Sequence, residues 1–447
     1  MIRNRTSLAK TPARKTALAC LEAALEASDP VRIVEEKIVV EGSTIAIDGA
    51  RYDLSGYEEV IVLGGGNAAG RVALALESVL GDRLNGGIVV TDDPHETDRI
   101  EVLPGDHPVP TERGVDSTRA LVARARDADE HTLVLAVVTG GGSALMAAPS
   151  PDVPLDELRA VTESLLASGA TIDEINAVRK HCSTIKGGGL ARAASPATVV
   201  GLVFSDVVGN DLSVIASGPI SPDSSTFSDA LAVLDRYDID APDAILTRLT
   251  AGANGDREET PRPGDPVFDR VSVHVLADGF TPLAGAREVA TERGYEPIVL
   301  SSRVRGEALE AAKTHAAIAE EIRATGNPVT GPAVVLSGGE TTVTIRGDGT
   351  GGPNQEFALS AAIELEGFAG FALASVDTDG IDGATEVAGA LVDGETADGE
   401  SESRTALEDN DSYTYLEGKG ALLETGPTGT NLNDFRVLVV ESRDHPR

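Results

Sequence analysis

The chain is poor in aromatic and sulfur-containing side chains. It contains no Trp, two Met and two Cys, and aromatic residues make up 3% of its 447 residues. Hydrophobic residues nevertheless reach 41%, so the cores must be built from Val, Leu, Ile and Ala. Because a chain of this length exceeds one ordinary core, we expect two domains.

Closely spaced cysteines and long apolar runs are missing as well. Cys20 and Cys182 form no local pair, which excludes a disulfide framework and favours a reducing compartment. The basic N-terminal segment is not followed by an apolar signal region, and no apolar run is long enough to span a bilayer. We expect a soluble, cytoplasmic protein with no membrane partner.

Lysine is scarce, whereas acidic residues are abundant. The formal net charge of -35 at pH 7 repels nucleic acid and anionic lipid, so neither is an expected partner. Acidic, lysine-poor surfaces suit a cytoplasm of high salt, where charge is screened and carboxylates keep the protein hydrated. The composition therefore predicts a halophilic protein. Its lysines are Lys10, Lys15, Lys37, Lys180, Lys186, Lys313 and Lys419.

Short apolar runs alternate with helical patterns along the first half of the chain, as is typical of a parallel α/β sheet. Helices are expected over 12–27 and 71–80, and a hairpin over 37–47. The expected parallel strands cover residues 60–63, 87–91, 133–138 and 198–204.

Residues 251–266 are polar and rich in Gly and Pro, which is typical of a domain boundary. We therefore predict two α/β domains, residues 1–262 and 263–447, the first a Rossmann-like parallel sheet. Strands of the second domain are expected at 271–277, 297–300, 333–337, 341–346 and 372–376.

The first strand-to-helix turn contains Gly64, Gly65, Gly66 and Asn67, followed by Ala69. This G-x-G-x-x-A spacing is typical of dinucleotide folds, in which a helix N-terminus binds a pyrophosphate. The alternative is that these glycines serve a tight turn and nothing more.

A second glycine-rich turn consists of Gly140, Gly141, Gly142 and Ser143. It lies between an apolar strand and a helix start, so its free N–H groups are candidates to bind a carboxylate or phosphate. The alternative is a loop that packs against a neighbouring backbone.

Basic residues near glycines are informative in so acidic a chain. Lys186 precedes three glycines and is the stronger candidate for an anion contact. Arg179 is a second candidate, with a surface ion pair as the alternative. Asp206 ends the strand over 198–204, where open α/β sheets bind ligands, and could orient or deprotonate a hydroxyl. Its alternative role is a helix cap or turn.

Three glycine-rich turns with carboxylates follow near the C-terminus, at 336–340, 347–356 and 377–383. Together they indicate a phosphoryl-transfer site. Asp379 and Asp382 are the candidate Mg²⁺ ligands, with aspartates of an ordinary turn as the alternative. The candidate nucleotide or substrate contacts here are Glu340, Asn354, Gln355, Glu356 and Thr378.

Longer segments in the same order resemble a known family. They cover residues 25–30, 105–110, 140–149, 175–191, 205–219, 337–346, 354–359, 378–383 and 425–435. The chain resembles the class II glycerate 2-kinases, which join a glycerate kinase domain to a C-terminal MOFRL domain. This resemblance implies ATP-dependent phosphorylation of D-glycerate to 2-phosphoglycerate with Mg²⁺, in a cleft between two α/β domains, and Asp206 matches the family's proposed active-site acid.

Two positions depart from that family's pattern. Asn67 stands where many members have Lys, and Pro353 stands where many have Arg. We expect Lys186 to supply the missing positive charge, with Arg179, Arg71 and the helix start after Gly140 to Ser143 as other candidates. The alternatives are an NAD(P)H-dependent reductase of hydroxypyruvate or tartronate, and a binder of nucleotide or sugar acid without catalysis. The sequence leaves the oligomeric state open, with a homodimer as one option.

Overall fold

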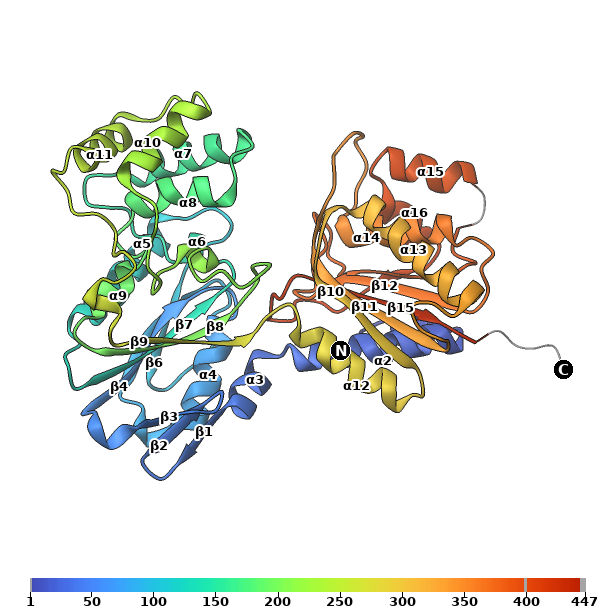
Figure 1. The fold of residues 1–447 in the computed structure, drawn as a ribbon, viewed down its shortest axis with the longest axis horizontal. Helices are drawn as coiled ribbons and strands as arrows, with labels where there is room; N and C mark the ends of the chain where they lie inside the picture. Colours follow the sequence, from blue (N-terminus) through green and yellow to red (C-terminus); the bar gives the residue numbers. More distant parts are fainter. Residues whose placement is uncertain (1, 398–399, 443–447) are drawn as a thin grey trace. The chain divides into compact units, whose positions relative to one another are not determined.

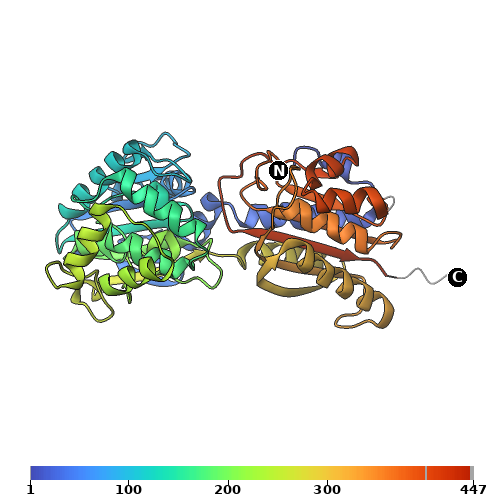
Figure 2. The same ribbon diagram turned by 90° about the horizontal axis from the view of Figure 1, so that it is seen from above.

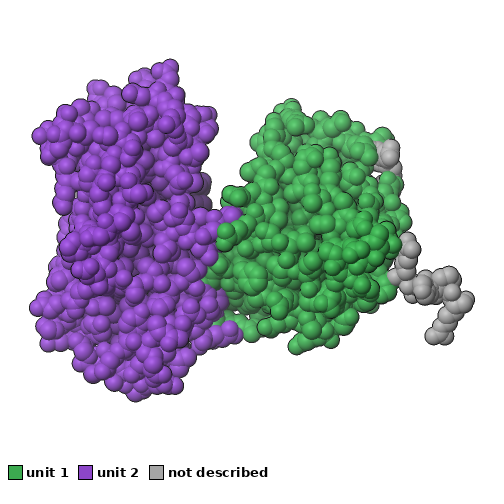
Figure 3. Space-filling model, in the orientation of Figure 1, with its two compact units in different colours: residues 1–32, 277–447 green, residues 33–276 purple. Residues whose placement is uncertain are grey.

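A computed structural model describes residues 2–397 and 400–442. The chain forms two compact units (Figures 1 and 3). Unit 1 consists of residues 1–32 and 277–447, and unit 2 consists of residues 33–276. Within the described residues, no helix has the length and apolar character needed to cross a membrane.

Unit 2 is built on a six-stranded sheet of order β6-β5-β4-β7-β8-β9. The pairs β5–β6, β4–β5, β4–β7 and β7–β8 are parallel, which confirms the predicted parallel sheet. The strand order reverses between β4 and β7, and ligands of open α/β sheets bind at the carboxyl ends of strands at such a point. The strands are β4 (Glu59–Gly65), β5 (Gly86–Thr91), β6 (Ile100–Pro104), β7 (Thr132–Thr139), β8 (Thr198–Phe204) and β9 (Val271–Ala277).

A small antiparallel sheet and the helices complete unit 2. The small sheet has the order β1-β2-β3, and its first pair confirms the predicted hairpin. Helices α7, α8, α10 and α11 share an apolar cluster of their own. The elements are α3 (Pro30–Lys37), β1 (Ile38–Glu41), β2 (Thr44–Ile47), β3 (Ala50–Asp53), α4 (Ala69–Leu80), α5 (Glu112–Arg126), α6 (Gly142–Leu145), α7 (Leu155–Ala167), α8 (Ile172–His181), α9 (Gly189–Ala194), α10 (Phe227–Arg236) and α11 (Asp243–Ala253).

Unit 1 contains a mixed six-stranded sheet of order β10-β11-β15-β12-β13-β14. Strands β10 and β11 are parallel, whereas β15 is antiparallel to both β11 and β12. One continuous strand, β11, covers 333–342, so the separate strand expected at 341–346 is wrong. The strands are β10 (Glu296–Glu307), β11 (Ala333–Thr342), β12 (Phe371–Asp377), β13 (Gly389–Val392), β14 (Leu422–Leu423) and β15 (Asp434–Val440).

Helices cover both faces of this sheet (Figures 1 and 2). Helices α2 and α12 pack on one face. Helices α13, α14 and α16 contribute to the core on the other face. The helices are α1 (Arg5–Leu8), α2 (Pro12–Ala27), α12 (Thr281–Glu292), α13 (Ala308–Thr325), α14 (Pro353–Glu364), α15 (Glu400–Glu408) and α16 (Ser412–Gly418).

The division into units differs from the predicted boundary after residue 262. Leu18 and Leu21 of α2 are fully buried in the same core as Leu283 and Phe435, so the N-terminal helix belongs with the C-terminal sheet. The polar segment after α11 remains in unit 2, because it packs there rather than crossing between units. Within it, the Glu259 carboxylate lies 2.9 Å from Nε2 of His181.

Candidate functional site

The first glycine-rich turn, at the end of β4, is closed by its own hydrogen bonds. Four successive N–H groups that lead into α4 donate to acceptors of the protein, so they are not available to a pyrophosphate. These bonds run from Gly66 to Val90 O (3.0 Å), from Asn67 to Gly140 O (2.9 Å), from Ala68 to Thr139 Oγ1 (3.3 Å) and from Ala69 to Gly66 O (3.1 Å).

The glycines of this turn allow strands to approach closely. Gly64 and Gly66 have φ values of 142° and 133°. A Cβ atom would lie 1.9 Å from Val137 O at Gly64, and 2.5 Å from Val90 O at Gly65. Packing therefore accounts for these glycines. The Nδ2 of Asn67 donates to the Asp92 carboxylate at 2.8 Å, and its Oδ1 lies against Gly141 of the second glycine-rich turn, where a Cβ atom would be 1.9 Å away.

The second glycine-rich turn, at the end of β7, is open. Among the described residues, the N–H groups of Gly141, Gly142 and Ser143 donate no hydrogen bond to another part of the protein, although Oδ1 of Asn67 packs against Gly141. Gly141 has φ 72°, in the left-handed region. Three free donors at the switch point of a parallel sheet can bind an anion.

Asp206 lies directly against this open turn. It follows β8, the neighbour of β7, and is partly exposed. A Cβ atom at Gly140 would lie 2.4 Å from Oδ2 of Asp206, so only glycine leaves room for the carboxylate. The structure thus brings together Gly140–Ser143 and Asp206 at the carboxyl ends of β7 and β8.

Lys186 reaches the same turn from the loop before α9. Its Nζ donates to the carbonyl oxygen of Ser143 at 2.6 Å, and the residue is 4% exposed. Burial, and next the nearby Arg179 guanidinium, hold the pKa of Lys186 well below its ordinary value. Burial also lowers the pKa of Arg179 to about 10. In the part of the chain that the structure describes, neither cation forms an ion pair with a carboxylate, so a bound anion would relieve their mutual repulsion.

Sequence analysis missed two polar residues beside this turn, Ser217 and Asn176. Ser217 is fully buried with φ 60°; its Oγ lies 2.7 Å from Ser143 Oγ and donates to Asn176 Oδ1 at 2.9 Å. Both residues lie within segments that carry the family resemblance, 175–191 and 205–219. Their positions in those segments were a signal that could have identified them.

In unit 1, Asp382 caps helix α14. Its two carboxylate oxygens accept hydrogen bonds from the backbone N–H groups of Asn354 (3.0 Å) and Gln355 (2.8 Å). The residue is 1% exposed, and this burial raises its pKa to about 6. An aspartate engaged in this way is a helix cap.

The Asn354-Gln355-Glu356 triplet lies in the first turn of α14 and is buried. Asn354 Nδ2 donates to Asp434 Oδ1 at 2.6 Å, and its Oδ1 accepts from Ser375 Oγ at 2.6 Å. Glu356 accepts a 3.2 Å bond from Asn410, and burial raises the pKa of its carboxyl. The side chains of Asn354 and Glu356 are therefore engaged in hydrogen bonds within unit 1, to Asp434, Ser375 and Asn410.

Thr378 and Glu340 differ in their surroundings. Thr378 is fully buried, and its Oγ1 donates to Asn433 O at 2.8 Å. This bond links the turn after β12 to the loop before β15. Glu340 is exposed near the end of β11. Desolvation by the surrounding protein raises the pKa of the Glu340 carboxyl, and the Asp434 carboxylate adds to this effect.

An acidic cluster forms where β12 ends and β15 begins. Asp377 and Asp434 are cross-strand partners. Burial raises the pKa of Asp377 well above its ordinary value, with Asp379 and then Asp434 adding to the effect. Asp434 is compensated by Arg436, whose Nη2 donates to it at 2.5 Å. Sequence analysis did not select Asp377 or Asp434, because their pairing depends on strand register.

Within residues 2–397 and 400–442, no three His, Cys, Asp or Glu side chains form a group that could hold a metal ion. Mg²⁺ keeps several waters and requires one or two carboxylates. Asp377 and Asp379 each accept a backbone N–H with one carboxylate oxygen, at 3.1 and 2.7 Å, and their mutual repulsion favours a nearby cation. Asp382 fits less well, because both of its oxygens accept N–H groups of α14.

The chain matches two family models and is similar to proteins with two different names. Residues 16–250 match the family described as DUF4147, a domain of unknown function, and residues 333–434 match the MOFRL family. The chain is 40% identical to the D-glycerate 2-kinase of Thermotoga maritima, over 96% of this chain and 98% of that protein. It is 42% identical to a putative hydroxypyruvate reductase of Agrobacterium vitis, over 85% of this chain and 87% of that protein.

A solved structure is similar along nearly the whole chain. The crystal structure of glycerate kinase from Thermotoga maritima superposes with a TM-score of 0.84 at 39% sequence identity. The superposition covers 95% of this chain and 99% of that one. The two α/β folds described above are thus shared with a solved protein.

Proposed function

The chain belongs to the class II glycerate 2-kinases, and from this premise we propose that it transfers the γ-phosphoryl group of ATP to the 2-hydroxyl of D-glycerate. The products are ADP and 2-phosphoglycerate. The observation that carries the proposal is the pair Lys186 and Arg179 beside the open turn Gly140–Ser143. Among the described residues neither cation forms an ion pair with a carboxylate, whereas the buried Arg14, Lys180 and Arg436 each do. Two such cations suit a reaction in which both substrates are anions.

Asp206 is proposed to position the attacking hydroxyl and to accept its proton as the new O–P bond forms. Phosphoryl transfer depends on positioning and electrostatic stabilisation more than on covalent chemistry. Lys186, Arg179 and the free N–H groups of Gly141 to Ser143 would stabilise negative charge on the reactants. Asn67, which stands in place of the family's Lys, is neutral and its amide N–H is bonded to Asp92, so it would supply no positive charge.

In unit 1, Asp377 and Asp379 are proposed to hold Mg²⁺, directly or through water. The metal would supply charge neutralisation for the phosphates of ATP. Asp382 is assigned to the helix N-terminus instead, which revises its expected role as a ligand. Contacts of Glu340, Asn354, Gln355, Glu356 and Thr378 with nucleotide or substrate remain predictions, as does a homodimer.

The reductase alternative is not favoured, because the N–H groups that would bind a dinucleotide pyrophosphate are already bonded at the start of α4. Purified protein in molar KCl with Mg²⁺ separates the candidates, and the salt matches the proposed halophilic cytoplasm. Formation of ADP and 2-phosphoglycerate from ATP and D-glycerate supports the kinase. NADH oxidation by hydroxypyruvate would support the reductase, and binding without turnover a non-catalytic role.

A further inference from the structure

The side-chain amide of Asn176 has an unused donor in the interior of unit 2. The residue is 2% exposed, and its Oδ1 accepts a hydrogen bond from Ser217 at 2.9 Å. Its Nδ2 has no hydrogen-bond partner among the described residues. A buried donor left in this way costs about 1–3 kcal/mol, so an acceptor supplied by a ligand would stabilise it.

Arg179 lies one helical turn after Asn176 on α8, and side chains three residues apart share a helix face. Its guanidinium also has no carboxylate partner within the described chain. The adjacent Lys180 differs, because it is paired with Asp223 at 3.2 Å in the interior. Of the two neighbouring cations of α8, Lys180 therefore has a carboxylate partner among the described residues, and Arg179 has none. Arg179 and the Asn176 amide can thus bind a ligand.

Both residues connect to the turn that faces Asp206. Ser217 links Asn176 to Ser143 through bonds of 2.9 and 2.7 Å, and Arg179 is close enough to Lys186 to lower its pKa. The Asp206 carboxylate lies against Gly140 of the same turn. The turn thus has donors for an anion on one side and a carboxylate for a hydroxyl on the other.

Resting on the proposed function, we infer that Asn176 Nδ2 and the Arg179 guanidinium together bind the carboxylate of the acceptor, a short 2-hydroxy acid. A planar guanidinium and one amide N–H provide the donors that a carboxylate needs. The more highly charged phosphates of ATP require more cations than this pair supplies. These two residues therefore select an acid over an uncharged polyol.

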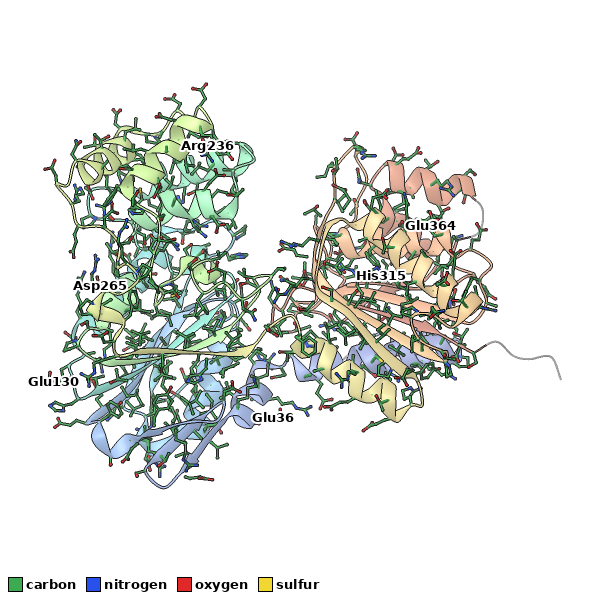
Figure 4. The ribbon with its side chains drawn as sticks, in the orientation of Figure 1. Glu36, Glu130, Arg236, Asp265, His315 and Glu364 are labelled. Carbon is green, nitrogen blue, oxygen red and sulfur yellow. The ribbon has the colours of Figure 1, made fainter. Side chains whose placement is uncertain are left out.

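The test uses the full chain in molar KCl, with KM for D-glycerate measured at saturating ATP and KM for ATP at saturating D-glycerate. Asn176→Asp keeps the shape and the acceptor for Ser217 but opposes a carboxylate, and Arg179→Gln removes the charge. Each should raise the KM for D-glycerate by about thirtyfold or more and leave the KM for ATP unchanged. Arg236→Gln is the control, since Arg236, labelled in Figure 4, is exposed. Its ion pair is with Glu174.

An unchanged KM for D-glycerate in both folded variants would overturn the inference while the kinase assignment stands. A raised KM for ATP alone would assign the pair to the nucleotide and also overturn it. Calorimetric titration of D-glycerate without ATP tests binding separately from turnover. If the wild type binds D-glycerate and the variants do not, the inference holds even where no phosphoryl transfer is found; absence of binding to the wild type overturns it.

Discussion

The ammonium nitrogen of Lys186 donates a 2.6 Å hydrogen bond to the backbone carbonyl oxygen of Ser143. This bond ties Lys186, which stands directly before the Gly187–Gly189 run, to the open turn after β7. An ammonium group has three donors, so one bond to Ser143 leaves donors for an anion. The arrangement explains how a chain with Asn67 and Pro353 in place of two family cations can still provide positive charge.

Replacement of Lys186 by Met should abolish most activity with little loss of stability. The substitution keeps the volume of the buried stem and removes the charge, and loss of one such stabilising donor typically lowers kcat by about a hundredfold or more. Steady-state kinetics and thermal unfolding measure the two effects. Lys313→Met is the matched control, because Lys313 is exposed and paired with Glu310. Full activity in Lys186→Met would leave the backbone turn as the anion site.

Asp206→Asn should lower kcat by about a hundredfold, the usual effect of a positioned acid–base group. The neutral amide fits the space beside Gly140 but cannot accept the hydroxyl proton. Asp211→Asn is the control, because Asp211 accepts a backbone hydrogen bond from Ser213 in the same segment and should retain kcat. Near-native turnover of Asp206→Asn would remove this residue from the mechanism.

The sequence predicts the parallel sheet of unit 2 well, because strands β4, β5, β7 and β8 are short apolar runs that end in, or are directly followed by, glycine or a small polar residue. These are local signals. The periodicity of residues 12–27 likewise predicts helix α2, but nothing local states that Leu18 and Leu21 will pack on the sheet of unit 1. The partner of an amphipathic helix is a tertiary property.

The two glycine-rich turns show the same limit at the candidate site. Both follow a buried strand and precede a helix, and their sequences do not reveal which is open. The difference arises because the carbonyl oxygens of Val90 in β5 and of Gly140, directly after β7, accept from the N–H groups of Gly66 and Asn67. The capping role of Asp382 and the pairing of Asp377 with Asp434 also depend on contacts between distant segments.

Asp382 and Asp379 should respond differently to substitution. Asp382→Ala removes the acceptor for two N–H groups of α14, and should lower the free energy of unfolding by about 1–2 kcal/mol, as expected for a lost cap. Its Mg²⁺ dependence should stay unchanged. Asp379→Asn should instead raise the Mg²⁺ concentration for half-maximal activity by about tenfold. Chemical unfolding and Mg²⁺ titration provide the measurements, and the reverse pattern would exchange the two assignments.

His315 on α13 should make the protein less stable in mild acid (Figure 4). The residue is buried, and its Nε2 lies 2.8 Å from the Ser337 hydroxyl. Burial, with a further contribution from Arg436, lowers the pKa of His315 from 6.5 to about 4. The unfolded chain therefore binds this proton first as the pH falls below 6.5, and the free energy of unfolding decreases until about pH 4.

A shift of this size corresponds to a loss on the order of 3 kcal/mol over that range. His315→Gln lacks the titrating group, so its stability should depend less steeply on pH between 6.5 and 4 than that of the wild type. Urea unfolding at constant KCl across this range measures the slope, and the difference between variant and wild type removes the effect of carboxylates that titrate in both. His131→Gln, at an exposed position, should follow the wild type. Equal slopes for wild type and His315→Gln would mean that the His315 proton is bound equally well in both states.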